Sequence, residues 1–384
     1  MTAPGARERA IGGWWWFLRG AASIALAAVL LGVVLPRVTG TRWSEISGVV
    51  GRLDAVDVAV LSAVWVFGIW LYAFTIKASL PGLTHAQAMT VNVTTSAVSN
   101  LVPFGGALGL AATFAICRTW GFTPGPVALS ALVTGIWNVL SKLALPMAGL
   151  MALAVSPGGG TGGLARPAAV GAAVLAVILV VLIGTLASEP LAVRTGRVAE
   201  AVGRAWLRIV RSPRRITWDE AVPRWRNEVN GLVAGGWLTL SAGLFGFLAS
   251  QAFLLYLILG MLGSTLGPAE VFAGFAFSRL LTTIVLTPGG TGFTEAGTAA
   301  LLVALGGEPA VCASGVLLFS GFVVFLEIPV GAVGSLVWLM RRSWRRPVNH
   351  QAGPTADATA DPGADQPSTS SVKSAPASRG ETTS

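Results

Sequence analysis

The sequence predicts an all-α polytopic membrane protein built from two inverted repeats, with about six full spans and two broken or re-entrant helical hairpins. Its 384 residues are 53% hydrophobic and only 11% charged, which leaves too little polar surface for a soluble domain of this size. Several apolar runs reach the length that crosses a bilayer. They lack the period-two alternation of membrane β-strands, so helices are expected.

The first half is predicted to contain three spans and one broken region. The first run is preceded by arginines, but no small-x-small cleavage site follows Val34, which argues for a retained anchor over a cleaved signal peptide. Tryptophans at the ends of runs, such as Trp43 and Trp338, suit an interfacial belt. In chain order the predicted elements are a span at 14–36, a span at 56–77, a region at 85–117 broken at Pro103–Gly106, and a span at 126–155.

The second half is predicted to repeat this pattern after a Gly-rich loop at 157–166. The segment from residue 347 onward is rich in Ala, Pro, Ser and Thr and is predicted to be a disordered cytoplasmic tail (347–384) after a transmembrane domain at 1–346. The predicted elements are a span at 167–187, a basic polar loop at 188–231, a span at 233–261, a region at 270–306 broken at Pro288–Gly292, and a span at 311–340.

An internal repeat is indicated by identical residues at an offset of 185 positions. The pairs include Pro103 with Pro288, Gly105 with Gly290, and Pro124 with Pro309. Matches at proline and glycine carry most weight because these residues fix the breaks in helices. Repeat one is expected at about 14–155 and repeat two at about 167–340.

Arginine placement predicts the topology. Arginines precede the first span, are frequent in residues 194–226 and recur at 341–346. Because such residues stay on the cytoplasmic side, both termini and the central loop are predicted to lie in the cytoplasm. The expected location is the plasma (inner) membrane. Each broken region must then return to the side from which it entered, and the two halves are inverted. Because these arginines explain the net charge of +9 as a topology signal, no nucleic-acid partner is expected.

The strongest candidate site is the segment 278–297, where Arg279 precedes a glycine-rich break and Glu295 follows it. Ionisable side chains at membrane depth are costly unless they are paired or face water. Free backbone N–H groups of the break and the start of the next helix would suit a lipid phosphate. In the alternative interpretation, the glycines only form a tight turn that an Arg279–Glu295 ion pair locks. The predicted substrate-binding residues are Arg279, Pro288, Gly289, Gly290, Thr291, Gly292 and Glu295.

A second candidate feature is an intramembrane charge pair between Lys142 and Glu327, which are related by the same offset of 185. Equivalent positions of an inverted repeat meet near its axis, so the two are predicted to pair, although each could instead face water or snorkel separately. The first break carries no charge at the matching positions. Pro103, Gly105 and Gly106 are therefore predicted to be structural.

Little in the sequence points to catalysis. The two histidines, His85 and His350, stand outside any cluster, and Cys117 and Cys312 share no motif with them. No catalytic residue, metal or cofactor is expected, and the protein is not expected to be an enzyme.

The element from Pro288 to Glu295, preceded by Arg279, resembles that of the lysylphosphatidylglycerol synthase transmembrane-region family, and the likeness covers most of residues 14–340. The resemblance implies a flippase-like domain, because better-understood members are the halves of multiple peptide resistance proteins that move aminoacylated phosphatidylglycerol between leaflets. No aminoacyl-transferase domain follows residue 346, so synthase activity is not expected.

The expected function is therefore translocation of a phospholipid or lipid-linked anion between leaflets. Expected partners are membrane lipids, namely an anionic or aminoacylated phospholipid or a lipid-linked saccharide. A homo-oligomer or an envelope-enzyme partner stays open. The alternatives are a non-catalytic scaffold for a cell-envelope lipid or glycan enzyme and, ranked lower, a lipid-modifying transferase.

Overall fold

The computed structural model describes residues 25–101, 105–155, 235–283, 287 and 290–344, with a few single residues between 173 and 194. All of them belong to one compact unit, Met1–Val348. The start of the first predicted span, nearly all of the span at 167–187 and the loop at 188–231, the 347–384 tail, and Pro103, Pro288 and Gly289 lie outside the described residues.

The described residues form an all-α membrane protein, as predicted. Four helices are long and apolar enough to cross a membrane, and they coincide with the spans predicted at 56–77, 126–155, 233–261 and 311–340. The last span contains a π-helical segment between two α-helices. These elements are α4 (Ala55–Ser79), α7 (Pro124–Val155), α11 (Trp237–Met261), α14 (Pro309–Ser320), η3 (Gly321–Phe325) and α15 (Glu327–Met340).

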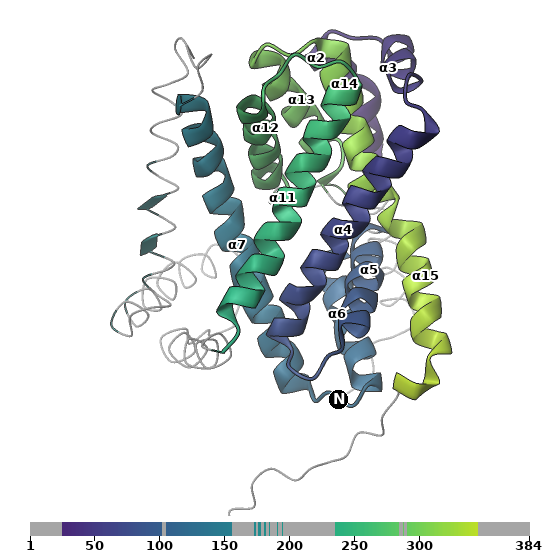
Figure 1. Cartoon of the computed structure of the whole chain (residues 1–384), viewed down its shortest axis with the longest axis vertical. Helices are drawn as coiled ribbons and strands as arrows, with labels where there is room; N and C mark the ends of the chain where they lie inside the picture. Colours follow the sequence, from purple (N-terminus) through teal and green to yellow (C-terminus); the bar gives the residue numbers. More distant parts are fainter. Residues whose placement is uncertain are drawn as a thin grey trace, which may run out of the picture. The chain divides into compact units, whose positions relative to one another are not determined.

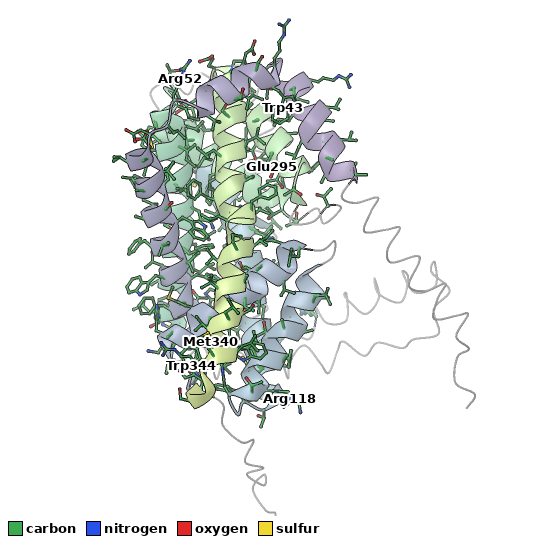
Figure 2. The ribbon with its side chains drawn as sticks, turned by 90° about the vertical axis from the view of Figure 1, so that its right-hand side faces the viewer. Trp43, Arg52, Arg118, Glu295, Met340 and Trp344 are labelled. Carbon is green, nitrogen blue, oxygen red and sulfur yellow. The ribbon has the colours of Figure 1, made fainter. Side chains whose placement is uncertain are left out.

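The first apolar run ends in a sharp turn that was not predicted from the sequence. The helix formed by η1 (Leu30–Val34) and α2 (Leu35–Thr39) stops at Gly40, whose φ of 71° is a left-handed conformation that glycine adopts freely. The chain then bends by 91° into α3 (Trp43–Val50), which lies across one end of the bundle (Figure 2). Ser314 of α14 donates a hydrogen bond of 3.2 Å to the Ile46 carbonyl and so fixes α3 there.

The two broken regions form helical hairpins. The first consists of α5 (His85–Leu101) and α6 (Gly105–Thr119), and the second of α12 (Pro268–Leu281) and α13 (Phe293–Ala304). Within each hairpin the two helices pack together. Their lengths of 12 to 17 residues fall short of the roughly 20 needed to cross a bilayer, which favours the re-entrant form.

Helices α4 and α11 form a central antiparallel pair. Thr75, near the end of α4, donates a hydrogen bond of 3.0 Å to the carbonyl of Leu240, near the start of α11. Gly68 of α4 faces Ser250, and Gly243 of α11 faces Thr75, with no room for a side chain at either glycine. Small residues of this kind let the backbones of membrane helices approach closely.

Each hairpin packs on the last span of the other half. Helix α5 packs on α15, where Gly331 meets Ala97, and α12 packs on α7, where Gly149 meets Ala273 and Ala276. The hairpins occupy opposite ends, with α5 and α6 low and α12 and α13 high in Figure 1. An inverted repeat requires this exchange of partners. The repeat over the whole chain stays a prediction, because most of residues 156–234 lie outside the described part.

Candidate functional site

A polar cavity lies inside the bundle where the hairpins meet the spans. It has a volume of about 280 Å³ and is lined from α5, α7, α11, α12, α13, α14, η3 and α15. Four ionisable side chains face it, together with amide and hydroxyl groups. The charged lining residues are Lys142, Arg279, Glu295 and Glu327.

The cavity lies near the middle of the membrane-spanning helices. Lys142 and Glu327 each follow by 18 positions the proline that begins their span, Pro124 or Pro309, and both spans are 32 residues long. A charge at this depth is expensive in hydrocarbon and is characteristic of sites that bind or move a ligand. Broken helices meeting at mid-depth are likewise typical of transporter binding sites.

Arg279 has one donor bonded within the protein and another without a partner in the described part of the chain. It stands in the last turn of α12, where its Nη1 donates a hydrogen bond of 3.2 Å to Oε1 of the buried Gln251. The guanidinium carbon lies 5.3 Å from the centre of the Phe275 ring, which adds a cation–π contact. Its Nε is buried and has no hydrogen-bond partner among the described residues. Arg279 therefore has one donor that the described residues leave unsatisfied, although the side chain lines the cavity.

Glu295 is engaged by the protein itself. It is 2% exposed and accepts hydrogen bonds from the Gly292 N–H group and, at 2.7 Å, from the Ser320 hydroxyl. The first contact resembles half of a capping box at the start of α13. No ion pair joins Glu295 to Arg279 in the part of the chain that the structure describes. The hairpin turn is therefore locked through Gly292 and Ser320.

The glycine-rich turn offers fewer free donors than its sequence suggests. Gly290 and Gly292 have φ values of 75° and 88°, as the predicted tight turn requires. However, the Gly290 N–H group donates to the Thr287 carbonyl at 3.0 Å, and the Gly292 N–H group donates to Glu295. The buried Thr291 accepts a hydrogen bond of 2.7 Å at its carbonyl from Thr287. Pro288 and Gly289 lie outside the described residues.

Lys142 and Glu327 line the same cavity but have different surroundings. Glu327 accepts a hydrogen bond of 3.0 Å from Asn100, at the end of α5, and interacts electrostatically with Arg279. Lys142 has neither a hydrogen bond nor an ion pair within the described ranges, and its electrostatic neighbour is Arg279. The direct Lys142–Glu327 pair stays a prediction.

The first break contributes to the site through Asn100 rather than through its glycines. Gly105 begins α6 so close to the Ser99 backbone that no side chain fits, which agrees with a structural role, while Gly106 is exposed. Pro103 lies outside the described residues. Asn100 and Asn138, both polar candidates from the sequence, line the cavity.

Sequence reasoning missed Gln251 and Ser320, which hold the two charged residues of the second hairpin. A signal for Gln251 was present, because it is the only amide side chain in the apolar helix α11. Ser320 gives no comparable signal, since serines are common in such helices and its importance depends on a contact across 25 residues.

The fold and the cavity together define a multi-pass helical membrane protein with a charged site at mid-depth between broken helices. The family model described as "Lysylphosphatidylglycerol synthase TM region" matches residues 20–331. The chain therefore belongs to this family, which confirms the resemblance predicted from the segment at Arg279–Glu295. A comparison with curated proteins found no match.

Proposed function

We propose that this protein moves a phospholipid or another lipid-linked anion between the leaflets of the plasma membrane, with both termini in the cytoplasm. The observation that carries the proposal is the cavity in which Lys142, Arg279, Glu295 and Glu327 gather at mid-span depth. A charged residue at the centre of a membrane helix costs about 2.5–3.5 kcal/mol on insertion scales. Four such residues around one cavity are best explained by a ligand that needs them.

The size of the cavity favours a lipid head group. Its volume of about 280 Å³ is close to the lower end of ligand pockets, which begin at roughly 300 Å³. A phosphate-containing head group fits such a space, whereas the acyl chains would stay in the bilayer. The family match to a protein region named for a lipid synthase supports a lipid as the ligand.

The helix arrangement suggests how the cavity could open to each side. Each hairpin packs on the last span of the opposite half through a glycine contact, at Gly331 and at Gly149. Rocking of one half against the other would move both hairpins together and expose the head group first to one leaflet and then to the other. No bond is made or broken in this process, so we propose a transporter and not an enzyme, without a cofactor.

Reconstitution tests the function. Purified protein is placed in liposomes with labelled phosphatidylglycerol, phosphatidylcholine or an aminoacylated phospholipid, and the loss of label from one leaflet is timed. We expect faster exchange than in protein-free vesicles, a large loss with Arg279→Ala and Glu295→Gln, and no change with the control Arg118→Ala at the exposed end of α6. Exchange equal to that of protein-free vesicles across the lipid panel would favour the scaffold alternative and a partner enzyme.

A further inference from the structure

The four charges of the cavity are not equally available to a ligand. Both oxygens of the Glu295 carboxylate accept hydrogen bonds from the protein, one from Gly292 and one from Ser320, and the side chain is almost fully buried. Glu327 is then the one carboxylate of the lining that can respond to a ligand. The charged groups that a ligand can still engage are therefore two cations, Lys142 and Arg279, and one carboxylate.

Within the described part of the chain, Lys142 is the cation that lacks compensation by an opposite charge. Arg279 interacts electrostatically with Glu327, but the electrostatic neighbour of Lys142 is Arg279, which has the same charge. Two like charges in a region of low dielectric constant repel strongly unless an anion lies between them. An anion bound in this cavity would relieve that repulsion.

The backbone keeps the two cations together. Lys142 belongs to α7 and Arg279 to α12, and these helices pack directly where Gly149 faces Ala273. A Cβ atom on Gly149 would lie only 3.1 Å from the Ala273 Cα, so a glycine here lets the two helices pack closely. Relieving the repulsion by separating the helices would cost this close packing.

The donors that face the cavity suit phosphate. The Nε of Arg279 is unpartnered, and Gln251 fixes the guanidinium at Nη1. A planar guanidinium binds two oxygens of one phosphate, and a lysine ammonium adds a compact charge on a third. The backbone donors of the glycine turn at Gly290 and Gly292 are already used within the protein. The donors considered for the anion site are therefore the side chains of Arg279 and Lys142.

We infer that Lys142 and Arg279 together bind the phosphate of a lipid head group, and that Glu295 positions the second hairpin without contacting that head group. The ligand class is a phospholipid with a net negative head group. A zwitterionic head group would bring an additional positive charge, which only Glu327 could balance. The inference rests on the proposed function for the ligand being a membrane lipid.

A binding measurement tests the inference without requiring transport. The full-length protein in detergent is titrated with fluorescent phosphatidylglycerol and, separately, with phosphatidylcholine of the same acyl chains. For Lys142→Met we expect phosphatidylglycerol affinity to fall about tenfold or more, as for loss of a hydrogen bond to a charged group. Phosphatidylcholine affinity should fall less, because the same change also removes a cation that repels choline. Lys142→Arg should retain most of the phosphatidylglycerol affinity.

Two controls make the result specific. Lys77→Met removes an exposed lysine at the end of α4 and should leave both affinities unchanged. Glycerol phosphate and inorganic phosphate are added as competitors, and neither should displace the lipid at concentrations comparable with it. Equal competition by either would make this a site for a soluble anion and overturn the assignment to a lipid.

Wild-type affinity in Lys142→Met, or an equal loss for both lipids, would overturn the role of Lys142. The outcome is separable from that of the transport assay. Selective binding through Lys142 without leaflet exchange would contradict the proposed function and support the phosphate site. Leaflet exchange that is insensitive to Lys142→Met would support the proposed function and contradict the phosphate site.

Discussion

Asn100, in the last turn of the helix that enters the first hairpin, donates a hydrogen bond of 3.0 Å to Glu327 in the last span, 227 residues further along the chain. The second hairpin reaches the same span, because Glu295 accepts a hydrogen bond of 2.7 Å from Ser320. The last span thus contacts both hairpins through polar side chains. The π-helical segment Gly321–Phe325 lies between these two contacts.

The π-helix explains how one span reaches both hairpins. In a regular α-helix with 3.6 residues per turn, Ser320 and Glu327 would be nearly two turns apart and would face the same way. The hydrogen bond from Leu326 N–H to the Gly321 carbonyl, at 2.8 Å, spans five residues and widens the turn. Glu327 is thereby rotated away from the face of Ser320. Segments of this kind are frequent at functional sites.

The Asn100–Glu327 contact should couple the two residues energetically. We expect Asn100→Leu and Glu327→Gln each to lower the thermal unfolding midpoint, and the double variant to lose less than the sum, with a coupling energy of about 0.5–3 kcal/mol. Because the hydrogen bond is made to a carboxylate in a low-dielectric site, we expect a coupling energy toward the upper end of this range. Unfolding of all four proteins in one detergent measures the cycle. Strict additivity would show that the contact has no energetic weight.

Ser320→Ala should destabilise the second hairpin. It removes a donor from a carboxylate that is 2% exposed, and an unsatisfied buried group costs about 1–3 kcal/mol or more when charged. The matched control is Ser335→Ala in the same span, because among the described residues the Ser335 hydroxyl bonds only to the Gly331 carbonyl of its own helix. The thermal unfolding midpoints of the two variants are measured in the same detergent and compared with that of the wild type. Equal shifts for the two variants would contradict a special role for Ser320.

Gln251 should act by positioning Arg279. Gln251→Glu places a carboxylate against the guanidinium, so we expect higher stability from the charge-assisted bond but weaker binding of phosphatidylglycerol, because Arg279 is then neutralised. Gln251→Leu removes the acceptor and should lower both quantities. Thermal midpoints and lipid titrations of the same preparations give the two readouts. A Gln251→Glu protein with wild-type lipid affinity would place the ligand away from Arg279.

Gly331 tests the packing of the first hairpin on the last span. An added Cβ would clash with the Ala97 side chain and the Val93 backbone, so Gly331→Ala should cost about 1–3 kcal/mol through overpacking. Gly135→Ala in α7 is the matched control, because no atom lies near a Cβ at that position, and it should be neutral or slightly stabilising. The thermal unfolding midpoints of the two variants compare a glycine in a packed helix contact with a glycine that has free space around it. Equal stability would show that α5 and α15 can separate without cost.

The features that sequence could predict are those set by local chain physics. A helix must be long and apolar to cross the bilayer, and a Pro-Gly pair interrupts it, so α4, α7, α11 and the breaks near Gly105 and Gly290 were expected at nearly their observed positions. Arg279 with Glu295, and Lys142 with Glu327, were expected as two separate charged features because charges at this depth are costly. That all four line one cavity was not expected.

The partners of these charges could not be predicted, because they depend on contacts between distant segments. The repeat offset relates Lys142 to Glu327 but says nothing of Asn100, which holds Glu327, or of the like charge beside Lys142. A repeat with strict symmetry also has no place for the π-helix, since the equivalent residues 136–140 are regular α-helix. The bend of 91° after Thr39 had a weak signal in Gly40, but a glycine alone does not fix an angle.

Exchanging the charges of Lys142 and Glu327 separates the pair predicted from the sequence from the phosphate site inferred from the structure. A direct ion pair is indifferent to its direction, so the double variant Lys142→Glu with Glu327→Lys should restore the activity that each single variant loses. In the observed arrangement a carboxylate at position 142 would instead neutralise Arg279, and a lysine at position 327 could not accept the hydrogen bond of Asn100. We therefore expect no rescue of phosphatidylglycerol binding or of leaflet exchange. Recovery in the double variant, measured in the same lipid titration and liposome assay, would favour the direct pair and require Lys142 to contact Glu327 when the ligand is bound.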